Sequence, residues 1–144
     1  MNISVGNDHR GYEVKVKVVE LLKELGHSVD DVGADKEDNV DYPDIANMVS
    51  RRVSDGVSDR GILICGTGIG MSIAANKRKG VRAAVCHDLV TVEMSRRHND
   101  LNVLCLSAQQ YQVKDLVSIW LETEFEGGRH ERRVKRIADM ENEF

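Results

Sequence analysis

A cysteine followed by three alternating glycines is the stretch of this sequence with the clearest chemical use. In "ILICGTGIGMSIAANK" (62–77) an apolar run ends at Cys65, and Gly66, Gly68 and Gly70 lead into a helical segment. Backbone N–H groups at a helix start bind anions, and the same positive field favours a thiolate. A base beside an anion hole suits proton removal from carbon next to a carbonyl. A buried cysteine that ends a core strand before a tight turn is the alternative, and the residues alone leave both open.

The spacing of these glycines weakens the case for a nucleotide. A Rossmann fingerprint needs its third glycine three positions after the second, whereas Gly70 follows Gly68 after two. A Walker loop ends in Gly-Lys-Ser/Thr, and Gly70-Met71-Ser72 lacks the lysine. We therefore expect the loop to serve a small anionic ligand.

Two further polar clusters follow predicted strands. Asp8 and His9 lie in "GNDHRG" after the first strand, and Tyr42 lies in "DYPD" before a helix opened by Pro43. We expect Asp8 and His9 at the same sheet edge as Cys65. The alternatives are that Asp8 caps the first helix and that Tyr42 only packs against its neighbours.

His98 and Asn99 precede the predicted fifth strand and therefore lie at the amino edge of the sheet. Cys65 ends the third strand at the carboxyl edge, roughly 15–20 Å away for strands of ordinary length. One subunit can hardly use both in one site. Either His98 and Asn99 end a helix and form a turn, or they serve the site of a second subunit.

The final segment carries four arginines on one helical face. They are Arg129, Arg132, Arg133 and Arg136. Two arginines four positions apart can clamp a phosphate through charge-assisted hydrogen bonds. A solvated basic face is the commoner meaning of such a run, and a nucleic-acid patch is the next alternative.

Short apolar runs alternate with amphipathic stretches along the chain, which is typical of βα units and a parallel sheet covered on both faces. We expect strands near residues 2–6, 28–33, 60–65, 81–86 and 101–106. We expect helices at 11–25, after Pro43, at about 70–79, 88–97 and 110–123, and after Gly127-Gly128. The pattern predicts a doubly wound α/β sandwich, in which ligands bind beyond the carboxyl ends of the strands.

Composition narrows the class of protein. A chain of 144 residues with 41% hydrophobic content predicts one domain with one well-buried core. A net charge of −4 and 4% aromatic content disfavour nucleic acid as a partner. The sequence shows no signal peptide and no apolar run of membrane-spanning length. Three cysteines without paired spacing suit a reducing cytoplasm, so we expect a cytoplasmic protein with a small-molecule ligand.

Six stretches together resemble one known family. They are "GNDHRGYEVK", "DVGADKEDNVDYPDIA", "GILICGTGIGMSIAANK", "VRAAVCHD", "SRRHNDLNVL" and "EGGRHERRVKRI". In this order they are similar to the motifs of the type B ribose-5-phosphate isomerases, a family that includes galactose-6-phosphate isomerase subunits. The resemblance implies a three-layer α/β/α sandwich with a five-stranded parallel, Rossmann-like sheet and an extra C-terminal helix. It also implies a homodimer or homotetramer with shared sites.

The activity that the resemblance implies is aldose–ketose isomerisation of a sugar phosphate through a cis-enediolate, without metal or organic cofactor. Cys65 would be the base that moves the proton between C1 and C2, and Thr67 would polarise or relay. His98 would assist ring opening from the other subunit, with Asp8 at the same oxygens. The backbone N–H groups that would hold the enediolate oxygen are those of Gly66, Thr67, Gly68, Ile69 and Gly70.

The resemblance also implies the groups that bind the rest of the substrate. His9, Tyr42 and Asn99 would contact the sugar. Arg129 and Arg133 would bind the phosphate.

One position departs from the family pattern. After "NVL" the family usually has a Gly-x-Arg ending whose arginine contacts substrate, whereas "NVLCLSAQ" places Gln109 there. Ribose 5-phosphate is the first expectation for the substrate, and another tetrose, pentose or hexose phosphate is the second. The remaining alternatives are a non-catalytic sugar-phosphate binding module and, with less support, a nucleic-acid protein that uses the basic last helix.

Overall fold

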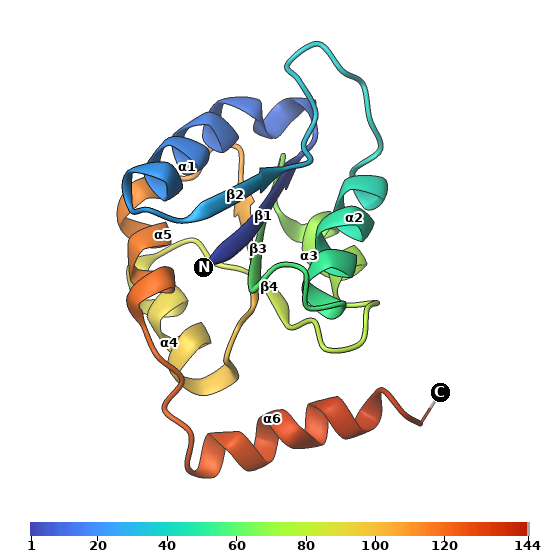
Figure 1. The fold of residues 1–144 in the computed structure, drawn as a ribbon, viewed down its shortest axis with the longest axis vertical. Coiled ribbons are helices and arrows are strands. Elements are labelled where there is room, and N and C mark those ends of the chain that lie inside the picture. The colour runs from blue at the N-terminus through green and yellow to red at the C-terminus, as the bar shows by residue number, and fades with distance from the viewer. Residues whose placement is uncertain (144) are drawn as a thin grey trace.

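Five parallel strands form one sheet in the structure, a computed structural model that describes residues 1–143 (Figure 1). The strands are β1 (Asn2–Asn7), β2 (Ser28–Asp31), β3 (Arg60–Cys65), β4 (Ala83–Val85) and β5 (Val103–Ser107). Their order across the sheet is β2-β1-β3-β5-β4. The three inner strands are almost wholly buried, because helices cover both faces of the sheet.

Six α-helices and one short 3-10 helix connect and cover these strands. The 3-10 helix is η1 (His9–Gly11), and the α-helices are α1 (Tyr12–Glu24), α2 (Tyr42–Ser54), α3 (Ile69–Ala75), α4 (Leu89–Asn99), α5 (Val113–Glu122) and α6 (Arg129–Met140). None of the helices in the described part of the chain has the length and apolar composition needed to cross a membrane.

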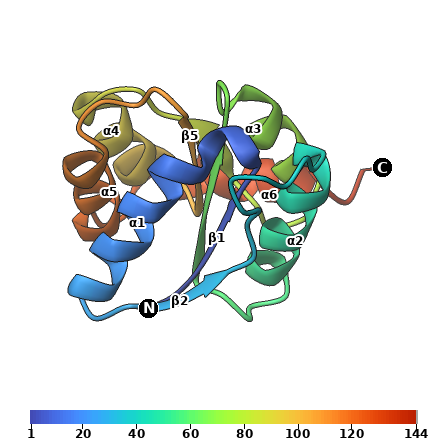
Figure 2. The same cartoon turned by 90° about the horizontal axis from the view of Figure 1, so that it is seen from above.

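The molecule has three layers. Helices α1, α4 and α5 cover one face of the sheet, and α2 and α3 cover the other (Figures 1 and 2). Side chains of β3 alternate between them: Ile62 and Ile64 enter the first core, and Leu63 and Cys65 enter the second. The predicted α/β sandwich with a five-stranded parallel sheet and a C-terminal helix is therefore confirmed.

The strand order follows from right-handed crossovers. From β3 the chain crosses through α3 to the edge strand β4, and it then returns through α4 to place β5 between them. The two crossovers run in opposite directions across the sheet, so right-handed connections put α3 and α4 on opposite faces.

Several helices and strands begin or end at residues other than those expected from sequence. At two helix ends, side chains form hydrogen bonds to the backbone. The carboxylate of Asp8 accepts the N–H groups that begin η1, and α1 therefore starts at Tyr12 rather than at 11. Helix α3 stops at Ala75 rather than near 79, because the Asn76 amide makes two hydrogen bonds to the backbone of Ala83, each 2.8 Å long. The edge strands β2 and β4 are also shorter than expected, since each has only one neighbouring strand.

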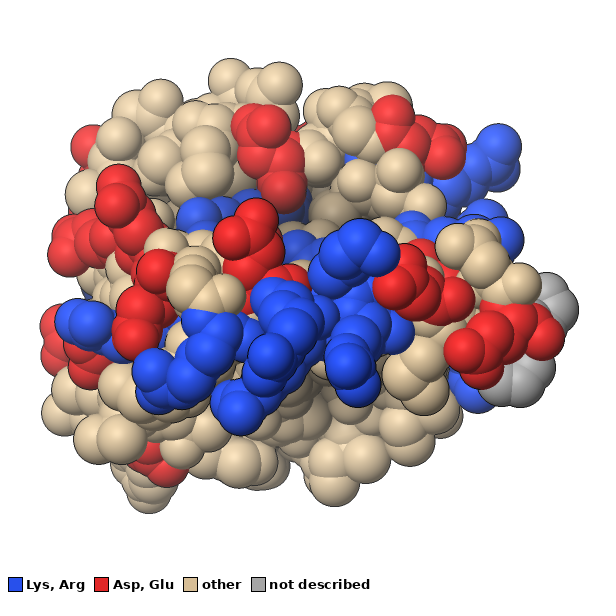
Figure 3. Space-filling model, turned by 90° about the horizontal axis from the view of Figure 1, so that it is seen from below, with Lys and Arg blue, Asp and Glu red and all other residues tan. Residues whose placement is uncertain are grey.

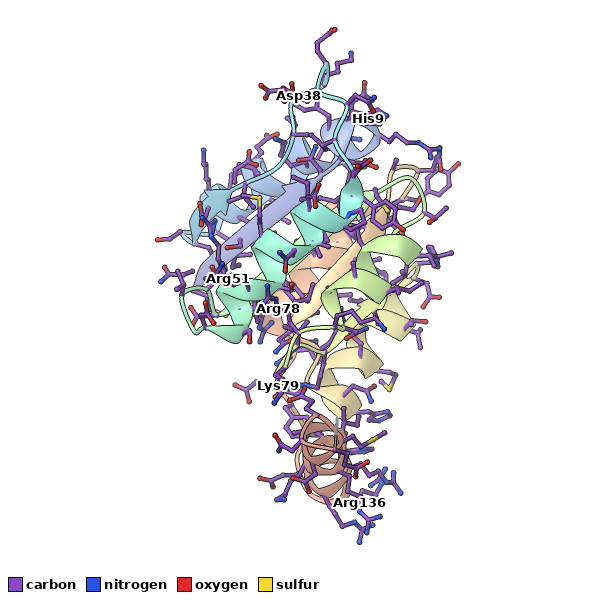
Figure 4. The ribbon with its side chains drawn as sticks, turned by 90° about the vertical axis from the view of Figure 1, so that its right-hand side faces the viewer. His9, Asp38, Arg51, Arg78, Lys79 and Arg136 are labelled. Atoms are coloured by element: carbon purple, nitrogen blue, oxygen red, sulfur yellow. The ribbon has the colours of Figure 1, made fainter. Side chains whose placement is uncertain are left out.

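Helix α6 lies apart from the sandwich, at one end of the molecule (Figures 1 and 4). It contacts α4. The His130 side chain is 6% exposed and stacks on His98 of α4, with 4.3 Å between the ring centroids. This aromatic contact anchors the first turn of α6, while the rest of the helix is mostly exposed.

Trp120 is the largest fully buried side chain of the core beneath α5, and its removal should be costly. Its indole N–H donates to the Leu101 carbonyl at 3.1 Å, and the Arg60 guanidinium lies 5.1 Å from the ring centre. We expect Trp120→Ala to lower the free energy of unfolding by about 3–5 kcal/mol, measured by urea denaturation. Tyr111→Ala, at a residue 85% exposed, is the control and should stay within about 0.5 kcal/mol of wild type. Equal losses in the two variants would contradict this core.

The stacked histidine should make stability depend on pH. Burial, with the nearby charges of Arg129 and His98, lowers the pKa of His130 from its ordinary 6.5. The unfolded chain therefore takes up a proton at His130 before the folded chain does, and stability should fall as the pH drops below about 6.5. His130→Phe keeps an aromatic ring but cannot titrate. We expect the melting temperature of wild type to fall more steeply between pH 7 and pH 5 than that of this variant, and parallel profiles would contradict it.

Candidate active site

The loop between β3 and α3 is built around the Cys65 sulfur. Gly68 begins α3 in a left-handed conformation, with φ +80°, and a β-carbon there would lie 3.1 Å from the Leu106 carbonyl. Only glycine fits both requirements without strain. The Gly68 N–H donates to Cys65 Sγ at 3.1 Å, and Cys65 is 5% exposed. The start of the helix thus directs one backbone hydrogen-bond donor at the sulfur.

Thr67 lies at the exposed tip of this loop. Its Oγ1 accepts a hydrogen bond from the Ile69 N–H at 3.2 Å, which leaves the hydroxyl proton free for another partner. The N–H groups of Gly68 and Ile69 therefore already have partners inside the loop. An oxyanion that binds here would share these donors with the Cys65 sulfur and the Thr67 oxygen.

A cavity of about 360 Å³ opens beside this loop at the carboxyl edge of the sheet. Its walls come from the segment after β1, the start of α2 and the β3–α3 loop: Asp8, Arg10, Tyr42, Cys65, Gly66, Thr67, Ile69, Gly70 and Ile73. Three segments that are distant in sequence therefore meet where the doubly wound fold predicts a ligand. The structure brings together Asp8, Tyr42, Cys65 and Thr67, which the sequence had predicted for one site.

Asp8 has both of the roles weighed from sequence, because it caps η1 and also lines the cavity. Its Oδ1 accepts the N–H groups of Arg10 at 3.0 Å and Gly11 at 3.2 Å. The side chain is 7% exposed, so these bonds fix its position. Its Oδ2 takes part in neither bond. His9, the next residue, is exposed at the same end of the molecule (Figure 4).

The ring of Tyr42 packs over Gly70. A β-carbon on Gly70 would lie 2.5 Å from Cζ of the tyrosine ring, so this glycine is needed for close approach. Tyr42 is 40% exposed and lines the cavity. Packing therefore positions the ring, and its exposed part forms one wall of the site.

Arg10 is a cavity residue that the sequence analysis missed. Its guanidinium lies against Gly66, where a β-carbon would be 2.6 Å from Nη1 and 2.7 Å from Cζ. The only sequence signal was an arginine in the first loop, between His9 and Gly11. Nothing local in the sequence indicates that this side chain reaches the glycine loop 56 positions later.

Gln109 lies beside the same glycine without lining the cavity. The Ser107 hydroxyl donates to the Gly66 carbonyl at 3.2 Å, and the Gln109 N–H donates to that hydroxyl oxygen at 3.0 Å. The Gln109 side chain is exposed. Positions 10 and 109 therefore flank Gly66 from two different loops.

The remaining predicted residues lie at the opposite end of the folded molecule from the cavity. His98 and Asn99 end α4 just before β5 begins, at the amino edge of the sheet. Arg129 and Arg133 lie on α6, which crosses that end. Figure 4 shows His9 and Arg136 of α6 at opposite extremes of the molecule. Within one chain, these residues do not meet Cys65.

A broad band of basic side chains marks the α6 end (Figure 3). The arginines of this helix, Arg129, Arg132, Arg133 and Arg136, are exposed, and over residues 1–143 none of them forms an ion pair. This surface is therefore available to an anion.

His98, Glu126 and His130 are the residues of the described chain best placed to hold a metal, with ligand atoms within 4.8 Å of one another. Glu126 Oε1 lies 3.9 Å from His130 Nε2, which has no hydrogen-bond partner in the described structure. The two rings stack at an interplanar angle of 14°. Imidazole lone pairs lie in the ring plane, so nearly parallel rings do not converge on one ion. The geometry suits aromatic packing better than chelation.

Known proteins share this sequence and this fold. The chain matches the family model described as Ribose/Galactose Isomerase over residues 3–137. It is 44% identical over 142 residues to ribose-5-phosphate isomerase B of Escherichia coli, and the match covers 96% of this chain and 95% of that protein. It is 37% identical over 147 residues to D-erythrulose-4-phosphate isomerase of Pectobacterium atrosepticum, and the match covers 99% of this chain and 97% of that protein.

Among solved structures, ribose-5-phosphate isomerase B from Mycoplasma genitalium with bound ribulose-5-phosphate is 42% identical to this chain. The TM-score is 0.94, and the match covers 99% of this chain and 97% of that one. Sequence, fold and the order of the motifs agree over nearly the whole length. The protein is an isomerase, and the chain belongs to the ribose/galactose isomerase family.

Proposed function

We propose that the protein interconverts ribose 5-phosphate and ribulose 5-phosphate through a cis-enediolate, with Cys65 as the base. The observation that carries this proposal is the Cys65 sulfur in the cavity wall, with the N–H of Gly68 aimed at it from 3.1 Å. The names of the relatives from Escherichia coli and Mycoplasma genitalium support ribose 5-phosphate as the substrate. Both named sugars carry a phosphate, which agrees with the exposed arginines of α6.

The proposed reaction moves one proton between two carbons. The Cys65 thiolate takes the proton from C2 of the open-chain aldose, and the electron pair left on C2 moves into a double bond to C1. The C1 carbonyl oxygen then carries the negative charge, which the loop N–H groups and Thr67 stabilise. A proton passes from the C2 hydroxyl to the oxygen on C1. The cysteine finally returns its proton to C1, which leaves a C2 ketone and an unchanged enzyme.

We propose that the complete site needs two subunits. His98, Asn99, Arg129 and Arg133 lie too far from Cys65 to act in their own chain, so they would complete the cavity of a partner. Ile69 is 55% exposed and Ile73 is 59% exposed on the cavity wall. Exposed apolar side chains around a polar site are what a second subunit would cover. A homodimer is the smallest assembly that satisfies this, and a homotetramer would contain it.

The partner would contribute ring opening and phosphate binding. His98 would pass a proton between the ring oxygen and the C1 hydroxyl, with Asp8 of the first subunit at the same oxygens. Asn99, His9 and Tyr42 would hold the sugar hydroxyls. Arg129 and Arg133, one turn apart on α6, would bind the phosphate with several charge-assisted hydrogen bonds.

We also propose that this enzyme works in the cytoplasm. Cys65, Cys86 and Cys105 are all free thiols in the structure, and a mechanism with a cysteine base requires Cys65 to stay reduced. Burial raises the pKa of the Cys86 and Cys105 thiols, which fits two inert core residues.

A tetrose phosphate is the second candidate substrate, because the relative from Pectobacterium atrosepticum is a D-erythrulose-4-phosphate isomerase. Gln109 in place of an arginine also changes the charge near the substrate. A panel of four-, five- and six-carbon aldose phosphates, ranked by kcat/KM, separates these substrates.

Removal of the thiol should abolish the reaction. We expect Cys65→Ala to lower kcat for ribose 5-phosphate by about a thousandfold or more, because the proposed mechanism assigns the proton transfer between the two carbons to this thiol and gives Asp8 a role in ring opening. Cys65→Ser should fail as well, since a hydroxyl is not ionised at neutral pH. The assay follows ribulose 5-phosphate formation in the presence of a metal chelator. Cys86→Ala, which removes a buried thiol outside the cavity, is the control and should stay active; activity in Cys65→Ala close to wild type would refute the assignment.

If the active site is shared between subunits, mixing two inactive variants should restore part of the isomerase activity. Cys65→Ala and His98→Asn should each be inactive alone. After random subunit exchange, half of the dimers are mixed and one of their two sites is intact, so we expect about a quarter of the wild-type activity. Exchange is verified by native mass spectrometry with tags of different mass. Mixed dimers without activity would show that the two residues do not act in one shared site.

A further inference from the structure

The charge of Arg10 is the feature of the cavity that the proposed reaction leaves unused. The guanidinium lies against Gly66, next to the base, and it lines the cavity with Cys65 and Thr67. Over the described residues no carboxylate forms an ion pair with it. The Asp8 carboxylate lines the same cavity but forms no ion pair with this guanidinium. A guanidinium that is not engaged in an ion pair can attract an anionic ligand.

The backbone around Arg10 fixes where this charge lies. Its N–H donates to the Asp8 carboxylate at 3.0 Å, and the following Gly11 packs on Ile64 of β3, where a β-carbon would lie 2.7 Å from Cγ2. Asp8 Oδ1 accepts these backbone N–H groups, and in the described structure neither oxygen of this carboxylate forms an ion pair with the guanidinium. The first loop thus presents to the cavity a positive group that no ion pair holds in the described structure.

Arg10 and Gln109 approach the same point from two loops. The Arg10 guanidinium lies against the α-carbon of Gly66, and the backbone N–H of Gln109 is joined to the Gly66 carbonyl through the Ser107 hydroxyl. A side chain at position 109 therefore starts from backbone that lies beside the same glycine. Position 109 carries an uncharged amide in this chain, and position 10 carries the charge.

We propose that Arg10 binds the phosphate of the substrate and supplies the positive charge that position 109 lacks. The inference rests on the proposed sugar-phosphate activity and names a specificity residue of that same site. The planar guanidinium offers paired donors that match phosphate oxygens. In the proposed reaction the loop N–H groups and Thr67 stabilise the enediolate oxygen, which leaves the guanidinium for the phosphate.

A packing role for Arg10 over the flat Gly66 peptide makes a different prediction. Loss of packing would disturb the loop and lower kcat, and a new charge at position 109 would not correct it. Loss of a phosphate contact weakens binding in ground state and transition state alike, so it raises KM and leaves kcat nearly unchanged.

The experiment compares Arg10→Ala, Arg10→Lys and Arg10→Ala/Gln109→Arg with wild type. We expect Arg10→Ala to raise KM for ribose 5-phosphate about tenfold or more with kcat within about threefold, as removal of uniform binding predicts. The inhibition constant of inorganic phosphate should rise in parallel. Arg10→Lys should recover part of the loss, and Gln109→Arg should recover most of it. The matched control is Arg51→Ala on α2, which removes an arginine far from the cavity and should change neither constant (Figure 4).

Unchanged KM and phosphate inhibition in Arg10→Ala would overturn the proposal. A fall in kcat alone, or a loss that neither Arg10→Lys nor Gln109→Arg reduces, would overturn it in favour of packing. If wild type does not isomerise ribose 5-phosphate, the proposed function fails separately. Calorimetry with inorganic phosphate then still tests Arg10, because weaker binding in Arg10→Ala supports the contact and equal binding refutes it.

Discussion

The turn at Gly68 is the contact on which the site depends. Its left-handed backbone turns the chain from β3 into α3 within three residues, pressed against the Leu106 carbonyl of β5. The same residue donates its N–H to the Cys65 sulfur. Fold and chemistry thus use one backbone geometry: the turn that lets the strand and helix pack also aims a donor at the thiol. A side chain at this position would strain both.

Parallel strands impose the second constraint. Every β-strand of the sheet ends at the same edge, so Cys65, Asp8 and the start of α2 gather there, whereas the residues that precede β5 and those of α6 lie at the other end. No loop in the described chain spans that distance. A site that combines Cys65 with His98 must therefore come from two chains, and the exposed isoleucines beside the cavity give such an assembly apolar surface to bury.

Positive charge lies at both ends of the molecule, in the cavity and on α6. The cavity holds a guanidinium without a carboxylate partner, and the α6 face holds exposed arginines without ion pairs in the described structure. If the two ends meet in a dimer, both surfaces converge on one ligand. In the proposed role of Arg10, its guanidinium supplies from the first loop the positive charge that Gln109 does not carry.

Local pattern in the sequence determined the strands, the helices, the Cys65 loop and the edge at which it lies, because strand and helix periodicity and glycine turns are properties of neighbouring residues. The local pattern did not predict the ends of the shortened helices. Those ends depend on individual side-chain hydrogen bonds, from Asn76 to the backbone of Ala83 and from the backbone N–H of Arg10 to Asp8. Only the tertiary structure decided that β5 lies between β3 and β4, that His130 stacks on His98, and that Arg10 reaches Gly66. Those contacts join residues 32 and 56 positions apart, and no periodicity along the chain encodes which distant side chains packing will bring together.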